Sequence, residues 1–489
     1  MQLTASRHMK PVKVLLFIIL TLCSLGLASK FLAKLSINVA GEKVQALSDF
    51  TQKYTEKPDS TAYFAELQKQ EESKSLQERK EAILKKPSRS TADTLVLMQV
   101  EALESPAKFY FANENRAPMD KFFDELNKVK SDNTSLRIIH YGDSQIEMDR
   151  ISSYIREQLQ RSYGGSGMGL LPALEVTPKY TVAVQSVGSW NRRLTFGGGE
   201  NRAKHNRYGP MAYFCKKESE VASVIITARE NTSHKNKHFT RCKVIIGAID
   251  RPLEITSAVN GKTGEVKTLQ ASTSEQMVEF SADSAEGQIG LKFVGANADI
   301  LGISLEGNSG ISLDNIPMRG CSGTIFRRIN AETLRKTYQM LGVKALILQF
   351  GGNALPGMSS KTSADAYGKK FFDEIRYLKS IDPELIVFVI GPADMSVKIN
   401  GTFQTHQQLT NVRDALKKAT IDNGGIFWDM YEAMGGSGSM VQWVKSKPAL
   451  GSPDYIHFSQ KGAVKISEIF YQSLMKEYDM YLLRKKIQN

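Results

Sequence analysis

Histidine and cysteine are scarce in this chain, which has seven histidines and four cysteines among 489 residues. His234 and His238 are four residues apart, but they lie in a Lys-rich stretch without acidic or cysteine ligands beside them. Such a pair is more typical of a solvated loop than of a metal site. We therefore expect neither a metal nor a cofactor.

One of the cysteines, Cys23, lies in an N-terminal apolar run, which leaves three for the rest of the chain. Cys215 and Cys242 could form a disulfide in an oxidising compartment. Cys321 would then remain free, and its neighbours offer no base that would make it a nucleophile.

Nucleic-acid-binding motifs are also missing, although the net charge is +13. Aromatic residues do not alternate with the basic ones, and no homeodomain, zinc-finger or RNA-binding signature occurs. We expect no nucleic-acid partner. The basic surface is either simply solvated or suited to an anionic envelope polymer or lipid headgroups.

A long apolar run occurs near the N-terminus, where Arg7, Lys10 and Lys13 precede the uncharged stretch Val14–Ala28. This pattern is typical of an export signal, and Gly26-Leu27-Ala28 offers a cleavage site. The run is shorter than the roughly 20 residues of a membrane-spanning helix, but flanking apolar residues could extend it into an anchor. Residues 1–35 are therefore a signal peptide or a membrane anchor, which predicts a periplasmic or cell-envelope location with possible membrane association.

Four short strings stand out in the remaining chain, and each contains residues that ester hydrolysis uses. In chain order they are Gly142-Asp143-Ser144-Gln145, Gly320-Cys321-Ser322-Gly323, Gly351-Gly352-Asn353 and Asp454-Tyr455-Ile456-His457. The first and third follow compact apolar runs typical of buried strands, residues 136–141 and 345–350. Each string alone is more typical of a turn or a helix cap, so the interpretation depends on their joint occurrence.

A serine hydroxyl attacks an ester only when a base removes its proton. Ser144 is the candidate nucleophile and His457 the candidate base. Asp454 lies three residues before His457, so one helical turn would bring its carboxylate to the imidazole Nδ1. Candidate oxyanion donors are the backbone N–H groups of Ser144 and Gly323 and the side-chain amide of Asn353. Three more motif residues are expected to support the site: Asp143, Gly320 and Gly352.

The four strings resemble the motifs of the SGNH/GDSL hydrolase superfamily, which is named for its Ser, Gly, Asn and His. This resemblance implies a three-layer fold, with a parallel sheet between helices, that cleaves acyl and acetyl esters. The chain departs from the pattern at two places. Met318 and Arg319 stand where an Asn often precedes the second glycine motif, and Ala354 replaces an acid that is common after the Asn.

Residues 181–300 contain several short β-like runs separated by turn residues, which predicts a β-sandwich inserted into the hydrolase. This organisation resembles two-domain peptidoglycan O-acetylesterases, whose insert is similar to a carbohydrate-binding module. The hydrolase would then comprise residues 106–180 and 301–489, preceded by a polar, partly helical spacer at 36–105. Three aromatic residues of the insert either stack on sugars or fill its core: Trp190, Tyr208 and Tyr213.

After the insert, helical and apolar segments alternate, which predicts a parallel sheet with right-handed crossovers. The glycine-rich stretch 164–169 follows a helix rather than a strand, so it is not interpreted as a nucleotide-binding loop. The sequence thus predicts an exported serine esterase acting on an O-acetylated or O-acylated glycan, such as peptidoglycan or another polysaccharide. Two alternatives remain: a glycan O-acetyltransferase with the same triad, and a glycan-binding protein with an inactive hydrolase domain.

Overall fold

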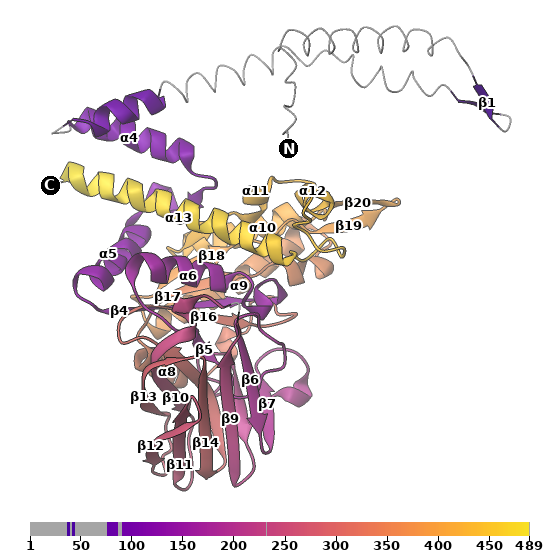
Figure 1. The fold of residues 1–489 in the computed structure, drawn as a ribbon. Coiled ribbons are helices and arrows are strands. Elements are labelled where there is room, and N and C mark those ends of the chain that lie inside the picture. The colour runs from indigo at the N-terminus through magenta and orange to yellow at the C-terminus, as the bar shows by residue number, and fades with distance from the viewer. Residues whose placement is uncertain (1–36, 40–41, 45–75, 87–89, 231, 489) are drawn as a thin grey trace, which may run out of the picture. The chain divides into compact units, whose positions relative to one another are not determined.

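The computed structural model describes residues 37–39, 42–44, 76–86, 90–230 and 232–488 (Figure 1). The chain divides into two compact units, residues 1–89 and 90–489. In the first unit, β1 (Ile37–Val39) and β2 (Glu42–Val44) form an antiparallel hairpin, and residues 76–84 are helical.

The predicted signal or anchor segment, residues 1–35, lies outside the described residues, as does about half of the predicted spacer. In the described part of the chain, no helix has both the length and the apolar character needed to cross a bilayer.

A six-stranded sheet forms the centre of the second unit, in the spatial order β16-β4-β17-β18-β21-β3. The first five strands are parallel and β3 is an antiparallel edge strand. The next two strands of this sheet along the chain, β16 and β17, lie on opposite sides of β4. The direction of winding therefore reverses at β4, and ligands bind at such switch points. The strand bounds are β3 (Phe109–Tyr110), β4 (Ser135–Gly142), β16 (Gly310–Pro317), β17 (Val343–Gln349), β18 (Ile386–Ile390) and β21 (Ile426–Trp428).

Helices cover both faces of this sheet and make it a three-layer structure, as the sequence predicted. Adjacent residues Ile138 and Ile139 are both fully buried but pack in different clusters, which is why the strands are almost continuously apolar. One cluster includes residues of α5 (Ala117–Ser131), α6 (Ser152–Tyr163) and α13 (Gln460–Gln488), which lie together in Figure 1. The other includes residues of α8 (Ala331–Leu341), α9 (Lys361–Ile381) and α10 (Leu409–Asp422).

Smaller elements complete this part of the unit. Helix α4 begins with a capping box, in which the Ser90 side chain accepts from the Asp93 N–H and the Asp93 side chain accepts from the Ser90 N–H. Hairpin strands β19 and β20 pair with each other only. The bounds are α4 (Thr91–Glu104), β19 (Ser396–Ile399), β20 (Thr402–Thr405), α11 (Met430–Met434) and α12 (Ser439–Lys445).

Two antiparallel sheets pack into a sandwich that is inserted between α6 and β16. One has the order β12-β11-β14-β9-β6, and the other β13-β10-β15-β8-β7 with β5 paired to β15. Its strands extend from Gly169 to Glu306, beyond the interval 181–300 suggested by the sequence. The bounds are β5 (Gly169–Leu171), β6 (Val182–Val187), β7 (Trp190–Leu194), β8 (Tyr213–Lys217), β9 (Val221–Ala228), α7 (His234–Lys237), β10 (His238–Ile246), β11 (Leu253–Val259), β12 (Lys262–Leu269), β13 (Gln276–Glu286), β14 (Gln288–Gly295) and β15 (Ala298–Glu306).

The glycine-rich stretch 164–169 passes directly against the backbones of β15 and β16. A Cβ atom on Gly165 would lie 2.4 Å from the Ile311 backbone nitrogen, and one on Gly167 would lie 2.2 Å from the Leu305 carbonyl oxygen. Both glycines also have positive φ, +101° and +85°. The glycines therefore serve close backbone packing.

The two cysteines of the sandwich are free and buried in its core, so the disulfide that the sequence allowed is excluded. Strand β15 lies between their strands, with Cys242 opposite Leu305 and Cys215 opposite Ile300. Two inter-strand spacings already separate them by roughly 10 Å, beyond the ~7 Å Cα separation that a disulfide permits.

Candidate active site

Two of the sequence motifs meet at the carboxyl edge of the parallel sheet. Ser144 begins the 3-10 turn η2 (Ser144–Asp149) after β4, and Asn353 lies in η5 (Gly352–Gly357) after β17. The strands are hydrogen-bonded neighbours in which Gly142 pairs with Gln349. The two side chains are therefore held at the same level, at the switch point of the sheet.

Ser144, His457 and Asp454 form a continuous hydrogen-bonded chain. Ser144 Oγ lies 2.8 Å from His457 Nε2, and His457 Nδ1 lies 2.7 Å from Asp454 Oδ2. The side chains of His457 and Asp454 are 30% and 46% exposed, so a substrate in solution can reach the site. The arrangement matches a nucleophile, a base and an orienting acid.

The segment that carries Asp454 is a turn and not the helical turn expected from the sequence. Asp454 Oδ1 accepts the backbone N–H groups of Ile456 and His457, both at 2.9 Å, and Tyr455 adopts a left-handed φ of +59°. Burial alone would raise the pKa of Asp454, but the backbone and ring hydrogen bonds from His457 and the Ile456 N–H lower it overall. The carboxylate is thus kept ionised beside the imidazole.

Asn353 is oriented by Asp143, the residue before the serine. Its Nδ2 donates to Asp143 Oδ2 at 3.0 Å, which leaves the second N–H of the amide for another acceptor. Nδ2 also lies 3.4 Å from the Cys321 carbonyl oxygen, which is a long contact. Asp143 Oδ1 accepts the Gln145 backbone N–H at 2.9 Å. Burial raises the pKa of Asp143 to about 6, against the opposing effects of the Gln145 N–H, the His457 charge and the Asn353 amide.

The second glycine motif approaches this site through a turn in which Cys321 and Gly323 are buried. The Gly323 N–H donates to Cys321 Sγ at 3.3 Å, so this predicted oxyanion donor contacts a sulfur, which is a weak acceptor. Gly323 has a φ of +79°, and a Cβ atom there would lie 2.7 Å from the Phe350 ring. Burial raises the pKa of Cys321 to about 12, which agrees with an unreactive thiol.

The other two supporting glycines have different surroundings. Gly320 is exposed at a turn with a φ of +75°, and its added Cβ atom would meet open space. A Cβ atom on Gly352 would lie 3.7 Å from Asp143 Oδ2. Gly352 is therefore close to the carboxylate that holds Asn353, whereas Gly320 serves the turn.

Gln145 holds the backbone on both sides of His457, a role that its sequence context did not predict. Its Nε2 donates to the Ile456 carbonyl at 2.7 Å, and its Oε1 accepts the Phe458 N–H at 3.3 Å. Because Gln145 directly follows Ser144, this amide couples the nucleophile segment to the histidine loop. In the sequence, the only indication of this role is the position of Gln145 in the first motif.

Two arginines strengthen the same junction. Arg150 donates to the Ser144 carbonyl at 3.2 Å and to the Phe458 carbonyl at 3.3 Å. Arg319, at the departure in the second motif, donates to both carboxylate oxygens of buried Glu147, at 2.8 and 2.6 Å. The second motif is thus tied to η2 by a bidentate ion pair.

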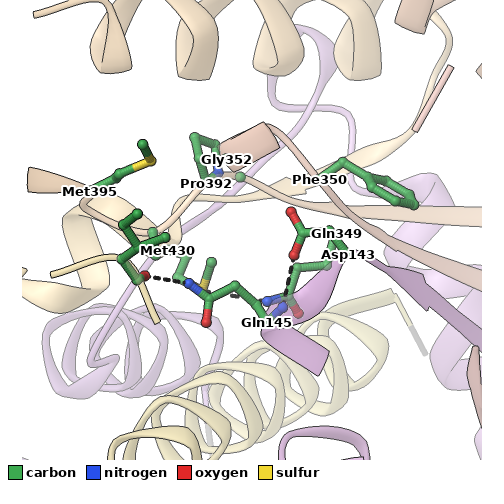
Figure 2. A pocket seen from close by; sticks show the side chains of 11 residues that line it. Asp143, Gln145, Gln349, Phe350, Gly352, Pro392, Met395 and Met430 are labelled. Atoms are coloured by element: carbon green, nitrogen blue, oxygen red, sulfur yellow. Dashed lines mark hydrogen bonds between the residues drawn. The ribbon is translucent and has the colours of Figure 1, made fainter. Parts of the chain in front are cut away.

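A small hollow adjoins Asp143 and Gln145, which lie side by side in Figure 2. It has a volume of about 20 Å³, room for roughly one water molecule or a methyl group. Its remaining walls are mostly apolar: Phe350, Pro392, Ala393, Met395, Met430 and Ile456.

Nearby groups are excluded as alternative bases or as stacking surfaces. His140 is fully buried, bonded to Gln349 Oε1 at 3.1 Å and to Ser152 Oγ at 2.9 Å, and burial lowers its pKa to about 3. Tyr208 and Tyr213 are 4% and 3% exposed, so they belong to the core rather than to a sugar-binding face.

A search against protein-family models found no match for this sequence, and a search of curated proteins found none. Among solved structures, a peptidoglycan O-acetylesterase matches with a TM-score of 0.60 and 20% identity, over 77% of this chain and 99% of that chain. A family two carbohydrate esterase from Clostridium thermocellum matches with a TM-score of 0.24 and 12% identity, over 60% of this chain and 100% of that chain. An acetyl xylan esterase matches with a TM-score of 0.26 and 16% identity, over 33% and 80%.

The first match establishes the fold, and the other two scores are too low to support an argument. The described chain is a three-layer structure with a parallel central sheet and an inserted β-sandwich, and it shares its fold with that esterase. Its two-domain organisation resembles that of the peptidoglycan O-acetylesterase. The 77% of the chain that is matched must include part of the sandwich, since the residues outside Gly169–Glu306 make up about 72% of the chain.

Proposed function

We propose that this protein is a serine esterase that removes O-acetyl or other short acyl groups from a glycan. The observation that carries the proposal is the chain of hydrogen bonds from Ser144 through His457 to Asp454 at the switch point of the sheet. These three groups supply a nucleophile, a base and an orienting acid in direct contact, which is the minimum that acyl transfer to serine requires.

The hydrogen bonds of these three residues support the following proton path. Asp454 accepts from the His457 Nδ1–H, so Nε2 carries the free lone pair and accepts the Ser144 hydroxyl proton. Ser144 Oγ attacks the ester carbonyl, and the imidazolium returns its proton to the departing sugar oxygen. Water, deprotonated by the same Nε2, then releases acetate from the acyl-serine.

The negative oxygen of each tetrahedral intermediate requires donors that are already in place. The second N–H of the Asn353 amide is one, because Asp143 fixes the amide plane. The Ser144 N–H is another, since the first N–H groups of a helical turn lack intrahelical acceptors. Gly323 contributes a third donor when its N–H exchanges the weak sulfur contact for the oxyanion.

Two observations favour a short acyl group on a carbohydrate. The hollow beside Asp143 and Gln145 has a volume of about 20 Å³, which is room for a methyl group. A solved structure with the same fold is that of a peptidoglycan O-acetylesterase. The basic, signal-like N-terminus supports export, and we place the substrate in the cell envelope or outside the cell.

Acetate release from O-acetylated peptidoglycan, with p-nitrophenyl acetate as the small ester, tests this function. The wild type should release acetate from both, and His457→Ala should lose at least about 10³-fold in kcat. Adding an acceptor glycan measures any acetyl transfer. Failure of the wild-type protein to hydrolyse either ester would overturn the proposal.

A further inference from the structure

A basic groove lies between a loop of the sandwich and the turn that follows the second glycine motif. Its volume is about 630 Å³, within the range of roughly 300–1,000 Å³ that is typical of ligand sites. The titratable side chains that line it are three cations and a histidine, with no acid among them: Arg202, Lys204, Arg328 and His205.

The groove is firmly attached to the catalytic part of the molecule. Arg328 Nη1 donates to the Thr195 carbonyl at 3.1 Å, and the Asn330 N–H donates to the Asn206 carbonyl at 2.8 Å. Tyr141, three residues before Ser144, donates its hydroxyl proton to the Pro210 carbonyl. The loop that carries the cations is therefore anchored to the strand that carries the nucleophile.

The cations of the groove are not held in close ion pairs by the acids that the structure describes. Within the described residues, Arg202, Lys204 and Arg328 form no ion pair. Asp299 is paired with His205 at 3.0 Å and Glu275 with Arg207 at 2.6 Å, and Glu374 acts on Arg328 only at longer range. Clustered like charges repel one another, so an anionic ligand would relieve this repulsion.

The aromatic ring exposed in the groove is that of His205, whose side chain is 43% exposed. The His205 ring stacks on Phe214, with centroids 5.3 Å apart and planes 14° apart, and buried Tyr208 packs beside both. The two buried rings hold the His205 ring in place beside the cations, and the guanidinium groups of the groove match carboxylates in a bidentate manner.

We infer that this groove binds carboxylate groups of an acidic glycan and holds the polymer while another part of it is deacylated at Ser144. The inference rests on the proposed function and narrows its substrate class to acidic glycans. Carboxylates bound there would add residence time for a polymer but not for a small ester.

The test compares the triple variant Arg202→Gln/Lys204→Gln/Arg328→Gln with a control that loses the same charge elsewhere, Lys262→Gln/Lys292→Gln/Lys344→Gln. The control lysines are exposed and lie outside the groove. Substrates are O-acetylated polygalacturonate, the neutral O-acetylated glucomannan and p-nitrophenyl acetate. The groove variant should raise the KM for the acidic polymer about 10-fold, because two or three charge-assisted contacts are lost. The KM values for the other two substrates should stay the same. Equal effects of both triple variants, or equal effects on both polymers, would overturn the inference.

Binding of unacetylated polygalacturonate, measured by calorimetry, separates this inference from the proposed function. The wild type should bind it, the groove variant should lose binding about 10-fold, and the control variant should bind normally. If esterase activity is absent but this pattern holds, the groove stands and the proposed function fails. If binding is the same in all three proteins, the groove inference fails whatever the esterase assay shows.

Discussion

Gln145 connects the segment that carries Ser144 to the loop that carries His457. Gln145→Ala would remove the contacts to the Ile456 carbonyl and the Phe458 N–H, and so loosen the loop that presents His457. A misplacement of about 1 Å typically costs 10²-fold in rate, so we expect kcat to fall about 100-fold while KM changes little. Steady-state kinetics on p-nitrophenyl acetate measure this.

Gln145→Glu is the matched control, because it keeps an acceptor for the Phe458 N–H but replaces the donor to the Ile456 carbonyl. It should be intermediate when the carboxylate is protonated and as impaired as the alanine variant when it is ionised. Unchanged kcat in both variants would show that Gln145 does not position the histidine.

The buried carboxyl group of Asp143 should make the free energy of unfolding depend on pH. Its pKa is raised to about 6 in the folded protein, whereas an unfolded aspartate has a value near 3.9. The unfolded state therefore loses this proton first as the pH rises, and stability falls between about pH 4 and pH 6, by up to about 3 kcal/mol. Asp143→Asn should lack this decline.

Urea unfolding at pH 4 and pH 7.5 tests this. The change in the free energy of unfolding between the two pH values is measured for the wild type and for Asp143→Asn, and the two changes are compared. Hydrogen bonds lost by the substitution at both pH values cancel in that comparison. An identical pH difference in wild type and variant would mean that the buried carboxyl is not protonated in the folded state at pH 4 to 6.

At the scale of elements, the apolar strands that precede Ser144 and Asn353 could be predicted from sequence because parallel strands are buried on both faces. The amphipathic helices α5, α6, α9 and α10 were recognisable for a related reason, their 3.6-residue apolar spacing. Strand β12 could not be recognised from the sequence, because most of its side chains are exposed and apolar residues do not alternate with polar ones along it. The Asp454 turn was missed because an Asp-x-x-His spacing fits a helix equally well.

The glycines at 164–169 make an element-scale prediction. Gly167→Ala should destabilise the protein by about 3 kcal/mol, since the added methyl group would meet the Leu305 carbonyl oxygen at 2.2 Å. Gly197→Ala is the control, because Gly197 has a similar φ of +79° but open space around it. It should cost only about 1 kcal/mol for the backbone conformation.

Thermal unfolding of both variants separates the two effects. A Gly167→Ala protein no less stable than Gly197→Ala would mean that the chain can move away from β15 at that point.

At the scale of the molecule, the sandwich and the catalytic sheet share buried contacts. Arg137 of β4 bonds to Asp314 at 2.9 Å and also pairs with Glu306 of β15. Phe214 and Leu301 of the sandwich lie in the same core cluster as Tyr141. The sequence identified the insert from its short β-like runs, but these contacts between distant segments leave no local pattern in it.

Replacing residues 181–300 with a short linker should therefore reduce both hydrolysis of p-nitrophenyl acetate and deacetylation of a polymer. The deletion would remove core side chains and leave Tyr141, three residues before Ser144, partly unpacked. Calorimetry should show a lower Tm. A deletion protein with normal Tm and normal turnover of the small ester would show that the sandwich is an independent domain.

The central claim is that Ser144 is an activated nucleophile, and covalent labelling tests it most directly. A fluorophosphonate reacts with serines whose hydroxyl is deprotonated by a neighbouring base. Intact-mass and peptide spectra should show one adduct on Ser144 in the wild type, none in Ser144→Ala, and strongly slowed labelling in His457→Ala. An adduct of equal yield on the Ser144→Ala protein, or no adduct on the wild type, would contradict the account.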